Sequence, residues 1–190
     1  MQGDFDLTLL AGRTLEHAVK DAIKQRYSVV ATGNLATGNG HGPRMEDAGR
    51  GVTLADLQLY RGVRAGWVEV KSKSRCNVYR NWNRAEHGID QRKLSEYRQL
   101  QLETGQIVYL LICEASTGAV LMQSIDTLMS VGQVRYGGGF ANWDRQTFAT
   151  VGKITIPVDD LRRVSVALDW NVFETFVTQP LLLEDFAHAN

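Results

Sequence analysis

Residues 53–74 read TLADLQLYRGVRAGWVEVKSKS, a segment that predicts a β-hairpin. The pair Gly62-Val63 is suited to a two-residue turn with glycine first, as a type II′ hairpin turn prefers. Apolar residues recur along both arms, yet Asp56, Glu69 and Lys71 stand among them. Charged side chains in a sheet are costly unless they are solvated or paired. The hairpin therefore has a wet face, or its charges are gathered for a function.

The register of this hairpin predicts where its charges meet. Counting outward from the turn places Asp56 directly across from Glu69. Opposed side chains in an antiparallel pair have Cβ atoms ~4.5–5.5 Å apart, so the two carboxylates can hold one cation. Strand alternation puts Lys71 on the same face and turns Val70 to the other.

Facing carboxylates repel each other unless a cation neutralises them. Magnesium is the natural candidate, because it accepts carboxylate oxygens, keeps several waters and completes its shell with phosphate. Lys71 beside such an ion can orient or deprotonate a water and offset charge in the transition state. This set suits hydrolysis of a phosphodiester. The alternative is a salt-bridged ladder of Asp56, Glu69 and Lys71 on a solvated sheet face.

Composition limits the class of protein. A chain of 190 residues with 44% hydrophobic and 22% charged residues is typical of one soluble globular domain. Its apolar runs are far shorter than the ~18 residues of a spanning helix, and its first residues do not resemble a signal peptide. Two cysteines, Cys76 and Cys113, make a disulfide framework or a cysteine-rich zinc site improbable, and a cytoplasmic setting is the default expectation.

Charge is unevenly distributed along the chain. The formal net charge is zero, but residues 61–84 hold seven basic residues and one acid, Glu69. A basic segment on an otherwise acidic protein indicates a directed anionic partner. The alternative is a solvated loop that happens to be rich in lysine and arginine.

The element order predicts one α/β domain with a mixed central sheet flanked by helices. Apolar spacing predicts a helix over residues 14–26. It predicts a second helix that begins with Asp90 as N-cap and ends at about Glu103, with Gly105 just beyond its end. Residues 33–51 are expected to form a glycine-rich loop, and the basic stretch after the hairpin runs without predicted structure to about His87. Strands besides the hairpin are expected over residues 27–32, 106–115, 119–125, 153–158 and 163–168.

The hairpin and its neighbours, about residues 13–115, resemble the active-site core of the PD-(D/E)XK nuclease superfamily. Asp56, Glu69 and Lys71 occupy the motif positions, with Ala55 where the motif's name has proline. The resemblance implies a restriction-endonuclease-like core within a single nuclease domain over 1–190, with residues 116–190 as a C-terminal elaboration. It also implies a DNA nuclease that uses Mg²⁺, with Mn²⁺ able to substitute. Asp56, Glu69 and the Val70 carbonyl would then bind the metal, and Lys71 would activate water.

Two further catalytic candidates follow from the resemblance. Glu16 matches a glutamate that many members carry on the first helix, and Gln91 matches a glutamine that some branches place after the lysine strand. The alternative for Glu16 is an acid favoured by the helix dipole in a first turn. A glutamine on a helix surface is ordinarily just solvated.

DNA is the substrate that the resemblance implies, and the basic stretch supports it independently. Its cationic and aromatic residues can contact phosphates and stack on an unpaired base; they are Lys73, Arg75, Arg80, Arg84, Tyr79 and Trp82. The alternative for the two aromatic residues is a lid over the core. Trp143, Asp144 and Arg145 either take part in substrate recognition or cap the core. A homodimer stays open, because nothing in the sequence identifies a dimer face.

Two other function classes compete with a nuclease. One is a nucleic-acid-binding module of the same fold without catalysis, which predicts salt-dependent binding without a metal requirement. The other is an interaction protein that binds a partner through its glycine-rich segments 33–51 and 136–140.

Overall fold

A computed structural model describes residues 14–32, 44–47, 50–75, 77–79, 84–131, 134–136, 139–156 and 163–177. For residues 44–47, 50–51, 77–79 and 134–136 it describes the backbone alone. None of the helices in these ranges is long and apolar enough to cross a membrane.

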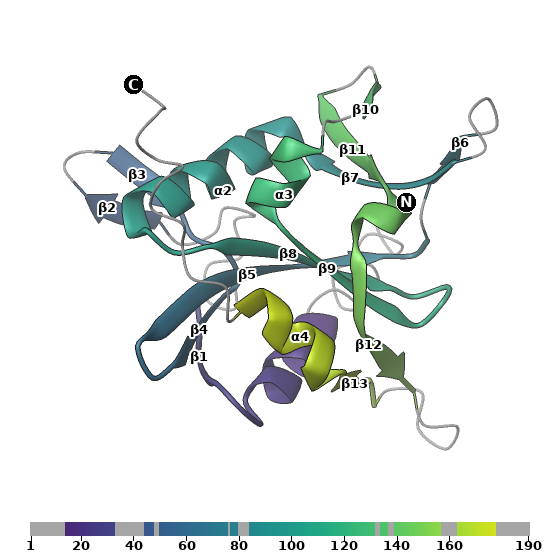
Figure 1. Ribbon diagram of the computed structural model, residues 1–190, viewed down its shortest axis with the longest axis horizontal. Helices are drawn as coiled ribbons and strands as arrows, with labels where there is room; N and C mark the ends of the chain where they lie inside the picture. Colours follow the sequence, from purple (N-terminus) through teal and green to yellow (C-terminus); the bar gives the residue numbers. More distant parts are fainter. Residues whose placement is uncertain are drawn as a thin grey trace, which may run out of the picture.

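A seven-stranded sheet forms the centre of the molecule (Figure 1). Its strand order is β1-β4-β5-β8-β9-β12-β13, where β5 and β8 are parallel and the other neighbours are antiparallel. The predicted mixed α/β fold is thus confirmed. The strands are β1 (Ser28–Ala31), β4 (Leu57–Arg61), β5 (Arg64–Lys73), β8 (Val108–Glu114), β9 (Ala119–Ser124), β12 (Ala149–Thr155) and β13 (Ser165–Leu168).

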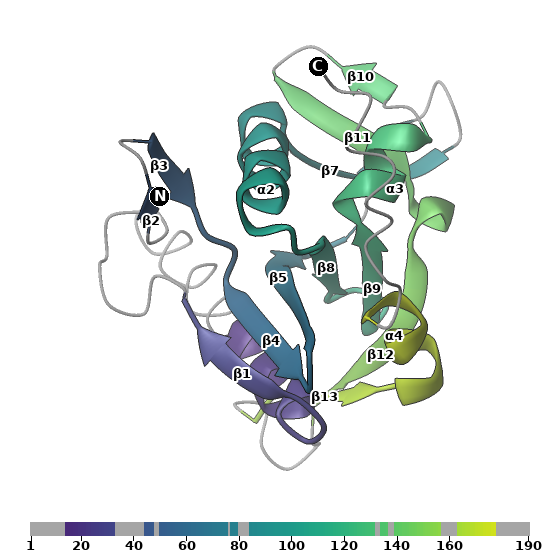
Figure 2. The same cartoon turned by 60° about the vertical axis from the view of Figure 1, so that its left-hand side comes forward.

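Each face of this sheet is covered by helices, as Figures 1 and 2 show. Residues 14–23 form a helix that packs with α4 (Trp170–Val177) against one face, where Val68 and Val70 are buried. On the other face, α2 (Gln91–Thr104) and α3 (Ile125–Ser130) cover Trp67 and Leu110. Every residue of β8 is buried, which explains its continuous apolar run between two helical layers.

The hairpin has the predicted register. Gly62 has a φ of 63°, as the first residue of a primed turn requires. Arg61 pairs with Arg64, and Leu57, the first residue of β4, pairs with Val68. Asp56 lies one residue before β4, at the point where the pairing with β5 ends.

Several elements were not expected from the sequence. The basic stretch, expected to be irregular, contributes β6 (Asn77–Tyr79) and β7 (Arg84–Asp90), and part of the expected loop 33–51 lies in β2 (Arg44–Asp47) and β3 (Arg50–Thr53). These segments are polar, and their strands are recognisable only by the partners that pair with them. Strands β10 (Val134–Tyr136) and β11 (Phe140–Asp144) join β7 and β6 in a second sheet, and η1 (Arg145–Thr147) follows β11. Helices α3 and α4 were missed because each has only a turn or two of periodic residues.

Helix α2 begins and ends where its capping residues predict. The Asp90 carboxylate accepts a hydrogen bond from Arg92 N at 2.7 Å, and Gly105 ends the helix with a φ of 61°. This helix packs over the face of β5 that carries Trp67, since Trp67 Nε1 donates to Thr104 Oγ1 at 3.3 Å.

Removal of the N-cap should destabilise α2. We expect Asp90→Ala to lower the free energy of unfolding by about 1 kcal/mol, because the Arg92 amide loses its acceptor. Asp90→Asn retains a capping oxygen and should lose only a few tenths of that. Urea denaturation of both variants checks this, and equal losses in the two would contradict a capping role.

Candidate active site

Asp56, Glu69 and Lys71 gather on the α2 side of the central sheet. Glu69 is buried at 4% exposure, and the Lys71 ammonium donates a hydrogen bond to its carboxylate. Asp56 Oδ2 accepts a hydrogen bond from the Val70 backbone N–H at 2.8 Å. The three residues therefore meet as the hairpin register predicts.

The end of the β4–β5 pairing explains how Asp56 is held. Beyond Leu57 no backbone carbonyl of β4 faces Val70, and the Asp56 carboxylate takes that place as acceptor. The backbone of Asp56 is fixed from the other side, because its carbonyl accepts from Thr32 N at 3.0 Å and Thr32 Oγ1 donates to the Ala55 carbonyl. Thr32, the residue that follows β1, thus anchors the backbone next to the acid.

The surroundings of Asp56 disfavour the ionised form of its carboxyl group. Burial, followed by the negative charges of Glu69 and Glu16, raises its pKa well above the usual range, although Lys71 and the Val70 N–H act in the other direction. The same charges act on Lys71. Burial tends to lower its pKa, but the carboxylates of Glu69, Asp56 and Glu16 outweigh this and raise it. The site therefore holds an excess of negative charge around one ammonium.

Tyr97 of α2 completes this group, although the apolar spacing of the helix marks it only as a core residue. It is 1% exposed, and its pKa is raised by burial, by the charge of Glu69 and by a hydrogen bond to that carboxylate. A phenol that keeps its proton can only donate to the carboxylate. Glu69 is thus fixed by Lys71 from its own strand and by Tyr97 from the helix above. No sequence signal separates such a tyrosine from an ordinary core residue.

The Val70 carbonyl lies on the side where the predicted metal would be. In a β-strand the N–H and C=O of one residue point to the same neighbouring strand. The Val70 N–H points toward Asp56, whereas the Trp67 N–H points to β8 and donates to Ile107 O at 2.9 Å. The Val70 carbonyl therefore also faces the open end of β4.

The residues present suit a magnesium ion. Among the described residues, no three His, Cys, Asp or Glu side chains form a closed metal-binding group. Magnesium does not need one, since it is commonly held by one or two carboxylates and completes its shell with water and substrate phosphate. Two repelling carboxylates beside a backbone carbonyl offer that kind of donor set.

Glu16 and Gln91 are placed differently. Glu16, on the N-terminal helix, is near enough for its charge to act on both Asp56 and Lys71. Gln91 is the first residue of α2, the end of the helix that lies toward Lys73, since the other end contacts Trp67. Its backbone N–H donates to Gly139 O at 2.8 Å, and its side chain makes no hydrogen bond to the described site residues. Its catalytic role stays a prediction.

The predicted nucleic-acid contacts are partly described. Lys73 is half-buried at the end of β5. Arg75, two residues further along the chain, and Arg84, the first residue of β7, are exposed. Tyr79 is the last residue of β6, for which the backbone alone is described, whereas Arg80 and Trp82 lie outside the described residues.

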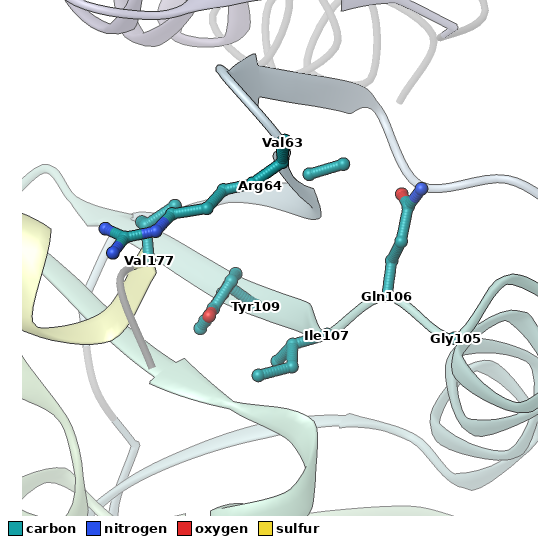
Figure 3. Close-up of a pocket in the computed structure, with 8 residues that line it drawn as sticks. Val63, Arg64, Gly105, Gln106, Ile107, Tyr109 and Val177 are labelled. Carbon is teal, nitrogen blue, oxygen red and sulfur yellow. The ribbon is translucent and has the colours of Figure 1, made fainter. Parts of the chain in front are cut away.

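A pocket of about 240 Å³ lies at the opposite end of β5 and is separate from this site. Figure 3 shows Arg64, Gln106, Tyr109 and Val177 around it. None of the candidate catalytic residues lines it.

The chain matches no protein-family model, and no curated protein sequence matches it. Among solved structures it is similar to Hjc, a Holliday junction resolvase from the archaeal hyperthermophile Archaeoglobus fulgidus, with 9% identity, a TM-score of 0.46, and coverage of 73% of this chain and 89% of that chain. It is also similar to D212, a nuclease from a fusselovirus, with 11% identity, a TM-score of 0.44, and coverage of 80% of this chain and 88% of that chain. The function of this chain is inferred from its own residues.

The raised pKa of Asp56 predicts that its charge destabilises the metal-free protein. An unfolded aspartate loses its proton near pH ~4, whereas folded Asp56 keeps it to higher pH, so the folded state binds more protons and stability falls as pH rises through that window. We expect Asp56→Asn to raise the free energy of unfolding at pH 8 by on the order of 1 kcal/mol in the presence of a chelator, and less at pH 4.

The matched control is Asp21→Asn on the exposed surface of the N-terminal helix, which should change little at either pH. Urea titrations at both pH values measure the difference. A stabilisation by Asp56→Asn that is no larger at pH 8 than at pH 4 would contradict the charge explanation.

Proposed function

We propose that the chain is a metal-dependent nuclease that hydrolyses phosphodiester bonds of DNA. The observation that carries this proposal is the meeting of Asp56, Glu69 and Lys71 on one face of the sheet, with two repelling carboxylates fixed by neighbouring elements. Fixed like charges are costly in a folded protein and are typical of sites that bind a cation. This supports a catalytic role over a solvated ladder, since Glu69 is buried.

The proposed roles follow from the position of each residue. Asp56, Glu69 and the Val70 carbonyl would hold Mg²⁺, or Mn²⁺ in its place. When bound, the ion would polarise a phosphoryl oxygen and lower the pKa of a water. Lys71 would orient the attacking water and offset negative charge on the phosphate. Tyr97 would keep Glu69 in one orientation.

The flanking residues support DNA as the substrate. Lys73, Arg75 and Arg84 are cations at the Lys71 end of β5 and on β7, where they can contact phosphates on either side of the scissile bond. Glu16 would add a further carboxylate beside Asp56. The cytoplasmic setting and a homodimer remain predictions.

One observation favours the non-catalytic alternative. Lys71 is bonded directly to Glu69, so part of the negative charge is already neutralised within the protein. A binding module of this kind would bind DNA with a steep salt dependence and without a metal requirement. It would leave every DNA substrate intact.

Cleavage assays separate the two. We expect the purified protein with Mg²⁺ or Mn²⁺ to cut at least one of plasmid, linear duplex, single-stranded or branched DNA, and a chelator to stop it. Lys71→Ala, Glu69→Gln and Asp56→Asn should each lower kcat by at least about 100-fold, because each removes a group that acts on the reacting phosphate.

The control variant is Lys153→Ala, which removes an exposed lysine on β12 and should cut like the wild type. Absence of cleavage by the wild type beyond the Lys71→Ala background, on all four substrates, would refute the proposed nuclease.

A further inference from the structure

A second polar cluster lies beside the candidate active site, at the carboxyl ends of β5 and β8. Its centre is Glu114, the last residue of β8, which is fully buried. His87 Nε2 of β7 lies 2.9 Å from Glu114 Oε1, and Thr117 Oγ1 donates to the same carboxylate. Arg145 of η1 donates to it through Nε at 3.2 Å and 3.3 Å and through Nη2 at 3.1 Å.

Glu114 is ionised in this setting. Burial would raise its pKa, but hydrogen bonds from Arg145, Thr117 and His87 outweigh burial and lower the pKa to about 2. Burial also lowers the pKa of His87 despite Glu114, so this histidine is neutral and must donate from Nε2 to the carboxylate. The cluster is therefore a carboxylate whose acceptor positions are all used by fixed donors.

The hydrogen bonds to Glu114 fix the orientation of the Arg145 guanidinium. One edge of its guanidinium, Nε and Nη2, is occupied by Glu114, while Nη1 makes no hydrogen bond with the described residues. Its side chain is 31% exposed. A guanidinium fixed by one edge presents the other in a set orientation, the geometry that binds a phosphate through two parallel hydrogen bonds.

Lys73 lies near both clusters, because the charge of Lys71 acts on it and its own charge acts on His87. It pairs in register with Glu114 and shares a sheet face with Glu69 and Lys71. Two residues along a strand span ~6.6 Å, which separates the ammonium-bearing positions 71 and 73. Within the described part of the chain Lys73 has no salt bridge, although it is half-buried.

A purely structural explanation accounts for part of the cluster. The pair Glu114–Arg145 links the central sheet to η1, and Trp143 Nε1 also ties β11 to α3 through Leu128 O at 2.6 Å. Buried ion pairs are weak contributors to stability, however, because desolvation offsets their attraction. A structural lock also gives no reason to leave Lys73 half-buried and without a salt bridge to a described residue, while its charge is near enough to act on His87 of the cluster.

We propose that Lys73 and Arg145 form a phosphate subsite for the DNA strand next to the scissile bond, with Glu114 as the residue that positions Arg145. This inference rests on the proposed nuclease function, because it assumes a DNA strand that passes Lys71. The strand would place one phosphate at Lys71 and a neighbouring phosphate between Lys73 and Arg145.

The test measures binding and cleavage separately. Fluorescence anisotropy of a labelled single strand of about 20 nucleotides, and of its duplex, gives Kd over a range of salt concentrations in the presence of a chelator. We expect Lys73→Gln and Arg145→Gln each to weaken binding about tenfold. Each should also reduce the slope of log K against log salt by about 0.7 on the single strand and about 0.9 on the duplex.

Steady-state kinetics and the conservative variant Arg145→Lys add measurements that would not change if Lys73 and Arg145 had only a structural role. Both glutamine variants should raise KM for the cleaved substrate more than they lower kcat, since they remove contacts to a phosphate that does not react. Arg145→Lys should recover most of the salt slope but not the full affinity, because the ammonium lacks the fixed fork. Thermal unfolding confirms that each variant is folded.

Lys153→Gln is the matched control, because it removes one exposed charge on β12. If Lys73→Gln and Arg145→Gln match this control in Kd, salt slope and KM while the wild type cleaves DNA, the subsite is wrong and the nuclease stands. If both lower the salt slope but no protein cleaves DNA, Lys73 and Arg145 bind DNA phosphates, but the nuclease fails and the site is not next to a scissile bond.

Discussion

The repulsion between Asp56 and Glu69 is the constraint on which the site depends. A carboxylate pair of this kind separates unless the backbone prevents it, and here three elements do so. Thr32, which follows β1, donates to the Asp56 carbonyl, and the Val70 N–H donates to its side chain. Tyr97 and Lys71 donate to Glu69. The cost of burying these charges is borne by the packing of the sheet between its two helical layers, where Val68, Val70 and Leu110 are almost fully buried.

The parallel pair β5 and β8 is the platform that relates the two polar clusters. Parallel strands in register place side chains of matching positions on one face, so the face that carries Glu69 and Lys71 continues to Lys73 and Glu114. The first cluster is negative around one ammonium, whereas in the second the Arg145 cation binds one buried carboxylate and Lys73 pairs in register with it. This change in charge along one sheet face would suit the proposed metal ion at the first cluster and the phosphates of a DNA strand at the second.

What the sequence could predict was local. The hairpin register followed from Gly62-Val63, and the caps of α2 followed from Asp90 and Gly105, because turn and cap chemistry depend on neighbours in the chain. Tyr97, His87 and Arg145 could not be assigned, since their partners come from elements far away in sequence. The strands β6 and β7 were missed for the same reason: polar residues form strands there because other strands pair with them.

The ion pair between Lys71 and Glu69 indicates how one lysine can serve both the metal-free and the proposed working protein. Without a cation, Lys71 is the nearest positive charge and offsets part of the repulsion that Asp56 and Glu69 create. A cation bound by the two carboxylates would neutralise their charge instead and would weaken the electrostatic attraction between Glu69 and the Lys71 ammonium. Lys71, which lies on the same sheet face as Lys73, would then be free to contact a substrate phosphate. The same repulsion that makes the metal-free site costly would in this way make its ammonium available to the substrate.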